Sequence, residues 1–423
     1  MSIFEQRESD IRAYCRVYPV VFDTASNARQ TDDQGNEYID FFAGAGVLNF
    51  GHNNEAMKKA VIQYIEKNGV THSLDMHTTA KQTFMEKFTE VILAPRNMPH
   101  KMQFMGPTGT NAVEAALKIA RRATGREEIV AFTHGFHGMT LGSLACTANA
   151  YFRGAAGVPL NHVSHQPFGC EKLCKGCEVG CGIANLEQLR AQYEDPSSGI
   201  TPPAAFMVEV IQAEGGVNVA HKSWLKALET LAKDFGSLLI VDDIQVGVGR
   251  TGSFFSFDDC NIDPDIICLA KGIGGMGTPM ALNLVKPEVD KHWSPGEHTG
   301  TFRGQSLSFV AGTEGLKYFE GIEFLASVKE KAEVMSQALE PLVQYESVQV
   351  RGKGMILGLD VGTGENAKKI VERCFNKGLI IASCGTGGKV VKLIPPLTIP
   401  DNDLAEGLDI LVTTTQEVLE AAA

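Results

Sequence analysis

The sequence predicts an α/β protein with a mainly parallel β-sheet in a large domain and a smaller α+β domain built from both ends of the chain. From about residue 70 to residue 285, apolar runs alternate with helical patterns, which is typical of parallel strands joined by helices. The two ends differ, with a hairpin pattern near the start and several short apolar runs near the end. We therefore expect residues 1–70 and 315–423 to share the small domain and residues 71–314 to form the large one.

The expected elements follow from hydrophobic periodicity. Residues 27–40 read as a hairpin with its turn near Gly35. Residues 110–123 place Val113, Ala116, Leu117 and Ala120 on one helical face. Strands are expected at 127–133, 204–210, 237–244, 265–270 and 280–285, and a helix at 222–235. From about residue 315 we expect two helices, strands near 355–361, 379–382 and 390–394, and a final helix.

Composition and charge argue against several classes of protein. The chain has 423 residues, of which 44% are hydrophobic and 21% charged, so it can bury a sizeable core. Its net charge of −12 argues against a general nucleic-acid or membrane-surface binder. The N-terminus shows no signal-peptide pattern, and no apolar run reaches the roughly 18 residues of a membrane span. We expect a cytoplasmic protein whose 10 cysteines are mostly reduced.

A lysine and a carboxylate end successive apolar runs. Lys271 ends one run, and Asp242 with Asp243 ends the run before it. Charged groups at the rim of a buried sheet are costly unless they hold a ligand. Pyridoxal 5'-phosphate would use both, because the amine forms a Schiff base and a carboxylate keeps the ring nitrogen protonated. Since neighbouring strand residues face opposite sides, only one aspartate can reach the ring. Gln245 is a candidate partner of the ring hydroxyl.

Three other segments are candidates for the same site. Residues 106–118 form a small-residue turn that opens a helix, where Gly109 and Thr110 could receive a phosphate, although a plain capped helix fits as well. Phe136 and His137 follow a strand and could stack on a planar ring, although a turn with a packed phenylalanine also fits. Thr301, in the polar loop 298–305, could contact a phosphate or lie in an ordinary surface loop.

Two glycine-rich stretches raise a dehydrogenase as an alternative. Residues 247–252 and 272–277 both match Gly-x-Gly-x-x-Gly and follow predicted strands. The dinucleotide fingerprint requires a helix that begins within the motif. The residues after both stretches read as extended chain, so the sequence disfavours a dehydrogenase.

A cluster of cysteines has no evident place in a pyridoxal-phosphate site. Cys170, Cys174, Cys177 and Cys181 are suited to a structural zinc or iron–sulfur cluster, but their spacing matches no standard zinc finger or ferredoxin. Free thiols or a redox-sensitive pair are the alternatives. A metal-dependent redox or sensing protein built around this cluster is therefore a second functional hypothesis.

The motifs together resemble the class III pyridoxal-phosphate aminotransferases, which have fold type I. The resemblance rests on residues 109–118, 135–140, 241–252, the lysine strand and 300–304, which occur in the family's order and at its spacing. It covers nearly the whole chain. The resemblance implies that Lys271 is the Schiff-base lysine and Asp242 the partner of the ring nitrogen.

The same resemblance implies the remaining cofactor contacts. Gln245 matches the residue near the ring hydroxyl, and Phe136 the stacking aromatic. Gly109 and Thr110 match the phosphate-binding pair. Thr301 matches a threonine that reaches the phosphate of a neighbouring subunit, so a homodimer or homotetramer with shared active sites is implied.

Within the class, the sequence is most similar to the diaminobutyrate–2-oxoglutarate transaminases, over residues 39–54, 105–116, 301–305 and 396–411. This resemblance implies transfer of an amino group from L-glutamate to aspartate semialdehyde, giving L-2,4-diaminobutyrate, as in ectoine and siderophore pathways. Another ω-aminotransferase, acting on a polyamine, taurine-like or β-amino substrate, is the alternative, as is a non-transaminating enzyme of the same fold. Many ω-aminotransferases pair an arginine with a glutamate to hold a substrate carboxylate. Here those positions read Lys392 and Glu214, and lysine cannot bind a carboxylate through two parallel bonds.

Overall fold

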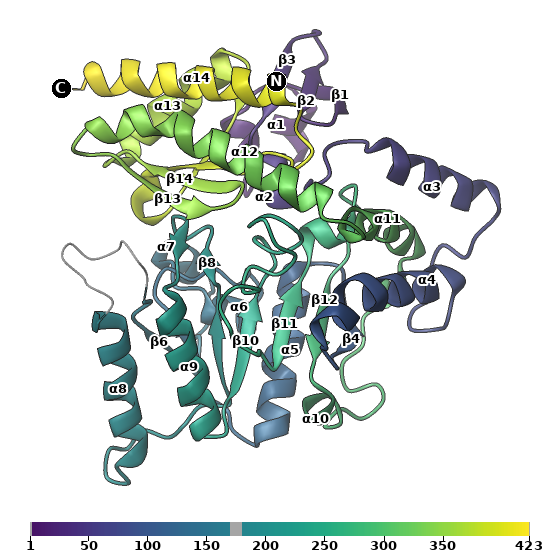
Figure 1. The fold of residues 1–423 in the computed structure, drawn as a ribbon, viewed down its shortest axis with the longest axis vertical. Coiled ribbons are helices and arrows are strands. Elements are labelled where there is room, and N and C mark those ends of the chain that lie inside the picture. The colour runs from purple at the N-terminus through teal and green to yellow at the C-terminus, as the bar shows by residue number, and fades with distance from the viewer. Residues whose placement is uncertain (1, 170–179, 423) are drawn as a thin grey trace.

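A seven-stranded sheet forms the centre of the molecule (Figure 1). The computed structural model describes residues 2–169 and 180–422. All strands of this sheet run in one direction except β12, which is antiparallel to both of its neighbours. In spatial order the strands are β4 (Lys101–Phe104), β12 (Leu282–Val285), β11 (Ile266–Leu269), β10 (Leu238–Asp242), β7 (Ala205–Val208), β5 (Ile129–Phe132) and β6 (Val163–Gln166). The predicted α/β fold with a mainly parallel sheet is therefore confirmed.

Three smaller sheets accompany the central one. The first contains β1 (Phe22–Ser26), β2 (Arg29–Asp32), β3 (Glu37–Asp40) and β15 (Leu379–Ile380). The second contains β13 (Gln349–Lys353), β14 (Ile356–Asp360), β17 (Val390–Leu393) and β16 (Ala382–Cys384), and the third β8 (Ile211–Gln212) and β9 (Asn218–Val219). The predicted hairpin is β2–β3, and Gly35 in its turn has φ +85°, which glycine adopts readily. Because β15 pairs with β3, the two ends of the chain meet in one sheet. The domain boundaries at 70 and 314 stay a prediction.

Helices cover the sheets. The long ones that pack around the central sheet and the small sheets are α3 (Glu55–Glu66), α4 (Thr79–Phe88), α5 (Gly109–Thr124), α8 (Gly180–Glu194), α9 (Lys222–Asp234), α11 (Ser306–Leu316), α12 (Glu323–Leu339), α13 (Gly364–Asn376) and α14 (Asp401–Glu420). The shorter ones are α1 (Ile3–Arg7), α2 (Ala43–Gly46), α6 (Leu141–Cys146), α7 (Ala150–Gly154) and α10 (Pro287–Asp290). Helix α5 buries Val113, Ala116, Leu117 and Ala120, the face that the sequence predicted. In Figure 1, α12, α13 and α14 lie together at the end of the molecule that also holds β1 to β3.

One predicted strand near residues 379–382 divides between two sheets. Leu379 and Ile380 pair with β3, whereas Ala382 to Cys384 pair with β17. A run of apolar residues can cross from one buried sheet to another because both environments exclude water. The sequence pattern therefore located the buried run but not the change of sheet.

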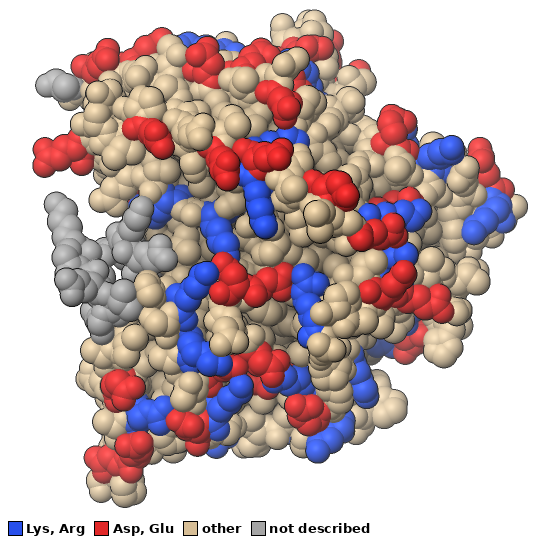
Figure 2. All heavy atoms as spheres, viewed as in Figure 1, with Lys and Arg blue, Asp and Glu red and all other residues tan. Residues whose placement is uncertain are grey.

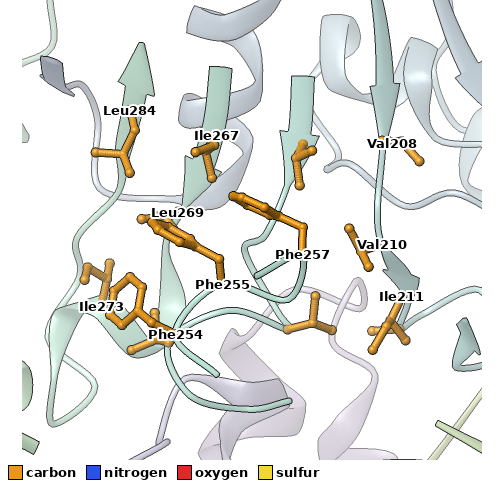
Figure 3. Close-up of a cluster of buried hydrophobic side chains, with 14 of the residues drawn as sticks. Val208, Val210, Ile211, Phe254, Phe255, Phe257, Ile267, Leu269, Ile273 and Leu284 are labelled. Carbon is orange, nitrogen blue, oxygen red and sulfur yellow. The ribbon is translucent and has the colours of Figure 1, made fainter. Parts of the chain in front are cut away.

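The core beside the central sheet is rich in phenylalanine (Figure 3). Phe254, Phe255 and Phe257 come from the segment after β10 and pack near Ile267 and Leu269 of β11. Phe254 and Phe255 meet edge to face with their ring centroids 4.9 Å apart, a favoured aromatic geometry. The segment that contains the first glycine-rich stretch is thus anchored on the sheet, and no helix begins within 247–252. That stretch therefore lacks the helix a dinucleotide-binding motif requires.

Arg250 connects three distant parts of the chain. Its guanidinium is fully buried and donates to the side chain of Asn49 at 2.7 Å and to the carbonyl oxygens of Met355 and Pro395. Burial lowers the pKa of Arg250 to about 9. The three acceptors come from the N-terminal segment and from two C-terminal segments, so one side chain joins them to the end of β10.

Charges are mixed on the surface. Figure 2 shows one face on which acidic and basic side chains are interspersed. Such a face has no single-sign field that would attract a polyanion. Among the described residues, no helix combines the length and apolar character needed to cross a bilayer.

Replacing Arg250 with methionine should lower the free energy of unfolding by about 3–5 kcal/mol, because each buried acceptor left without a donor costs about 1–3 kcal/mol. Chemical denaturation followed by fluorescence measures the loss. Arg96→Met is the matched control, since Arg96 forms a partly exposed pair with Asp258 and should cost about 0–1 kcal/mol. Equal losses in the two variants would contradict the role assigned to Arg250.

Candidate active site

A cavity of about 280 Å³ opens where the parallel strands of the central sheet end. In open α/β sheets, ligands bind outside the carboxyl ends of the strands. Strands β5, β7, β10 and β11 each deliver a polar or aromatic group to this edge. The lining residues are Thr108, Gly109, Thr110, Phe136, His137, Gly138, Met139, Glu209, Ile211, Glu214, Asp242, Ile244, Gln245, Val246 and Lys271.

Lys271 lies in the cavity directly after β11. Its backbone has φ +52°, a left-handed conformation that is uncommon outside glycine and recurs at functional sites. Desolvation lowers the pKa of the Lys271 amine to about 8, although Glu214, Asp242 and Glu209 act in the opposite direction. An appreciable fraction of this amine is therefore uncharged and nucleophilic near neutral pH.

The two aspartates that the sequence left unresolved face different surroundings. Asp242 lines the cavity, and its Oδ2 lies 2.8 Å from Nδ1 of His137. Asp243 is fully buried and accepts from the backbone N–H of Ser256 at 3.2 Å. Burial raises the pKa of Asp243 to about 7. Of the pair, the structure brings Asp242 to the cavity that contains Lys271.

His137 also lines the cavity beside Asp242 and is itself buried. Burial alone would lower the pKa of His137, but the hydrogen bond and charge of Asp242 outweigh it and raise the pKa. Glu209 at the end of β7 is a second buried acid beside this pair, and burial raises its pKa to about 7. The Glu209 carboxylate also accepts the backbone N–H of Phe136 at 2.9 Å. This bond fixes the backbone of the aromatic residue at the cavity wall.

The start of α5 forms another wall. Thr108 is the N-cap residue, and its backbone N–H and hydroxyl both donate to Oδ1 of Asn111, at 3.2 and 2.8 Å. A helix start presents backbone N–H groups without intrahelical partners, and its dipole favours an anion. Gly109 and Thr110, which follow Thr108, line the cavity. This wall suits a phosphate group.

Glu214, a half-buried residue that lines the cavity, forms an ion pair with Lys392, whose side chain is buried. Burial alone would raise the pKa of Glu214, but Lys392 and Lys271 outweigh it and lower the pKa to about 2. Burial alone would lower the pKa of Lys392, but Glu214 raises it above its ordinary value. Oε1 of Gln245 lies 3.5 Å from Nζ of Lys392. Nε2 of Gln245 donates to the carbonyl oxygen of Ala45 at 2.7 Å.

Ala45, whose carbonyl oxygen accepts from Gln245, belongs to a strained turn. Residues 43–46 all have positive φ, with Ala43 at 47° and Ala45 at 59°. A left-handed conformation costs roughly 1–2 kcal/mol for a residue with a Cβ atom. Asp40 offsets this strain by accepting the backbone N–H groups of Phe42 and Ala43 at 2.8 and 2.7 Å.

The donor set fits pyridoxal 5'-phosphate. Its aldehyde requires an uncharged amine, its ring nitrogen a carboxylate, and its phosphate a row of N–H and hydroxyl donors. Lys271, Asp242 and the start of α5 provide these three groups around one cavity. Phe136 and His137 lie on the same wall, and the phenylalanine is held by Glu209.

Some predicted residues lie elsewhere. Thr301 begins a short 3-10 helix, is exposed, and does not line this cavity. Cys170, Cys174 and Cys177 lie outside the described residues, as does the side chain of Cys181, so metal binding by this cluster stays a prediction. Within the described part of the chain, no group of three or more His, Cys, Asp or Glu side chains is arranged to hold a metal.

Sequence reasoning missed Glu209, although a signal was present. Glu209 follows the apolar run that becomes β7, as Asp242 closes the run that becomes β10. The rule that found Asp242 would therefore have found Glu209. Met139, Ile211, Ile244 and Val246 also line the cavity, but their apolar side chains resemble any core residue in the sequence.

Comparison with known proteins agrees with this geometry. A family model described as aminotransferase class-III matches residues 12–415. The diaminobutyrate–2-oxoglutarate transaminase of Halalkalibacterium halodurans is 48% identical over 423 residues, covering 99% of this chain and 97% of that protein. The enzyme of the same name from Streptomyces coelicolor is 47% identical over 422 residues, with 99% and 98% covered.

Solved structures share the fold. The ornithine aminotransferase of Toxoplasma gondii superposes with a TM-score of 0.84 at 24% identity, covering 99% of this chain and 94% of that one. Fold and cavity together define a pyridoxal-phosphate-dependent transferase of fold type I. The chain belongs to the class III aminotransferases.

The pKa of Lys271 can be measured directly. In the cofactor-free protein, labelling of Lys271 by an amine-reactive reagent should rise with pH and reach half its maximum near pH 8, because the uncharged amine is the reactive form. Mass spectrometry across a pH series gives the profile of each lysine. Exposed lysines serve as internal controls with midpoints near about 10.4. A midpoint for Lys271 equal to theirs would show that its amine is not desolvated.

Proposed function

We propose that the protein transfers the amino group of L-glutamate to aspartate semialdehyde, giving L-2,4-diaminobutyrate and 2-oxoglutarate. Two observations support the proposal. Lys271 and Asp242 line one cavity with the start of α5, and several relatives at 46–48% identity over nearly the whole chain carry the name diaminobutyrate–2-oxoglutarate transaminase. Such an activity would serve ectoine or siderophore synthesis in the cytoplasm.

In this proposal the cofactor is held at four points. Gly109 and Thr110 bind its phosphate at the start of α5, where the helix dipole favours an anion. Asp242 pairs with the ring nitrogen, and His137 fixes the orientation of that carboxylate through the 2.8 Å contact. Phe136 stacks on the ring, and Gln245 contacts the ring hydroxyl.

Lys271 moves protons in both half-reactions. When bound, pyridoxal phosphate supplies an electron sink that makes the hydrogen on the substrate's amine-bearing carbon acidic. Nζ of Lys271 removes that proton as a general base and later returns one as a general acid, which a pKa of about 8 permits near neutral pH. Asp242 keeps a negative charge at the ring nitrogen while this occurs.

The Glu214–Lys392 pair would select the two substrates. With Glu214 in place, the charge of Lys392 is neutralised and this end of the cavity accepts a chain without a carboxylate. If Glu214 turns away, Lys392 gains a free charge for a carboxylate of 2-oxoglutarate or glutamate. A lysine binds it as a point charge, in contrast to the two parallel bonds that arginine would form.

A second copy of the chain would complete the site. Thr301 is exposed, and the adjoining Phe302 is 59% exposed. Val70, Leu74 and Met76 are also exposed, and this segment is hydrogen-bonded to the Thr301 loop through Ser73 and Gly304. An exposed apolar patch of this kind is typical of a subunit interface. We propose a homodimer or homotetramer in which Thr301 reaches the phosphate of the neighbouring site.

The purified protein should be yellow when loaded with pyridoxal phosphate and should convert L-glutamate and aspartate semialdehyde into 2-oxoglutarate. Lys271→Ala should abolish the lysine-dependent absorbance and lower turnover by at least about 10⁴-fold, because it removes both the covalent anchor and the proton carrier. Absorbance and a coupled 2-oxoglutarate assay measure the two effects.

A panel of amino donors tests the substrate. Higher kcat/KM with a polyamine, taurine or a β-amino acid than with 2,4-diaminobutyrate in the reverse direction would favour another ω-aminotransferase. Product formation without any keto acid would point to a non-transaminating enzyme of this fold. A fully active Lys271→Ala variant would refute the mechanism.

Lys392→Met should raise KM for 2-oxoglutarate about 10- to 100-fold, because a hydrogen bond to a charged group contributes about 1.5–3 kcal/mol. Steady-state kinetics with each substrate varied separately provides the measurement. Lys389→Met is the matched control, because Lys389 is 40% exposed and pairs with Asp360 at 2.9 Å. Unchanged KM in Lys392→Met would remove Lys392 from substrate binding.

A further inference from the structure

A second cavity lies against the first and shares Glu214 with it. It has a volume of about 550 Å³, and its walls come from the segment after β5, from the start of α7, from the turn that contains Glu214, and from the loop 385–387. Phe136 and Glu214 line both cavities, so they stand between the two. Among the described residues that line the second cavity, Glu214 is the only acid, and none is a lysine or an arginine. A Glu214 side chain that leaves Lys392 therefore has a second space beside it.

The backbone of Glu214 is tied to the sheet that carries Lys392. The N–H of Gly385, which follows β16, donates to the carbonyl oxygen of Glu214 at 2.9 Å. Nε of Arg351, in β13, donates to the carbonyl oxygen of Gly216 at 2.7 Å. Lys392 is 1% exposed, whereas Glu214 is half-buried between two cavities. The Glu214 side chain is therefore the member of the ion pair that has space to turn.

Separation of the ion pair leaves two charges without a partner. Lys392 is buried, and a buried cation needs a counter-charge. A carboxylate of 2-oxoglutarate or glutamate supplies that charge when the substrate is bound. The carboxylate of Glu214 then needs hydrogen-bond donors in its new place, because an ionised carboxylate only accepts.

His134 and Thr386 provide such a donor in the second cavity. Nδ1 of His134 lies 3.3 Å from Oγ1 of Thr386. Burial lowers the pKa of His134, as does the charge of Arg351, so the imidazole is neutral at pH 7 and carries one N–H. The two side chains together have one N–H and one O–H hydrogen, and the bond between them uses one. Whichever of them donates in that bond, one hydrogen is left for a carboxylate.

Both of these residues adjoin the turn that contains Glu214. A Cβ on Gly215 would lie 3.1 Å from the Cβ of His134 and 2.3 Å from its carbonyl oxygen, so the two backbones touch. Thr386 follows Gly385, whose N–H binds the Glu214 carbonyl oxygen. The backbone of His134 has φ +68°, a left-handed conformation that is costly for a residue with a Cβ atom and recurs at functional sites.

We propose that the second cavity receives the side chain of Glu214 when a substrate carboxylate binds Lys392, and that His134 and Thr386 are positioning residues that bind the displaced carboxylate. The inference rests on the proposed function, because it assumes that Lys392 binds a carboxylate of 2-oxoglutarate or glutamate. A substrate without a carboxylate at this end leaves Glu214 on Lys392 and does not use the second cavity. The two donors therefore act on the dicarboxylate substrates alone.

Glutarate tests this inference without turnover. It has the two carboxylates of 2-oxoglutarate but neither a keto nor an amino group, so it binds without reacting. Calorimetry gives its Kd for the full-length protein loaded with pyridoxal phosphate. Steady-state kinetics with 2-oxoglutarate and with 2,4-diaminobutyrate gives a second measurement on the same variants.

The double variant His134→Gly/Thr386→Val removes both donors. It should raise the Kd of glutarate about 10-fold, the effect of one lost hydrogen bond to a charged group. KM for 2-oxoglutarate should rise by the same factor, whereas KM for 2,4-diaminobutyrate should stay at its wild-type value. Glycine suits the left-handed backbone of His134, and Thr386 is exposed, so this variant should fold.

Two controls separate binding of Glu214 from general damage to the cavity. His134→Gly/Thr386→Ser keeps one hydroxyl hydrogen and should bind glutarate more tightly than the double variant with valine. In Glu214→Ala there is no carboxylate to receive, so adding His134→Gly/Thr386→Val should leave the Kd of glutarate unchanged. This double-mutant cycle assigns the effect of the two donors to Glu214.

An equal Kd for glutarate in the wild type and in the double variant with valine would overturn the inference. An increase in Kd that persists in the Glu214→Ala background would overturn it as well. A wild type that does not bind glutarate, or a Lys392→Met variant that binds it as tightly as the wild type, would instead refute the proposed selection of substrates by Glu214 and Lys392.

Discussion

The desolvated amine of Lys271 is the constraint on which the rest of the site depends. Its pKa of about 8 reflects burial against three acids, Glu214, Asp242 and Glu209, that partly compensate it. With fewer acids, desolvation would lower the pKa of the amine further. With more water, its pKa would approach that of an ordinary lysine, and the amine would be a poor nucleophile at neutral pH.

The acids beside Lys271 are themselves paired with other charged or polar groups. Glu214 is paired with Lys392, and Asp242 with His137, so each ionised acid beside Lys271 has a second partner. Burial raises the pKa of Glu209, because a further buried negative charge is costly. The backbone bears strain at the same place, at Lys271 and at Ala45, and hydrogen bonds from Gln245 and to Asp40 hold the second of these turns.

The sequence pointed to residues that line the cavity where they end or open a regular element. Lys271 closes a buried run and Gly109 opens a helix, and both signals depend only on neighbours in the chain. The same rule applied to β7 would have added Glu209. It could not choose between Asp242 and Asp243 without the resemblance, because both end the same strand and only the partners of each side chain, His137 and Ser256, distinguish them.

The sequence by itself determined the class of fold, the order of the strands along the chain and most groups that face the cavity, because periodicity and strand ends are local properties. Only the tertiary structure decided which of these groups meet. The pairing of β15 with β3, the link from Gln245 to Ala45 and the contact of Glu114 with Thr140 join residues far apart in the chain or on different elements. Such contacts depend on how the elements pack, and packing is a property of the whole chain rather than of any segment.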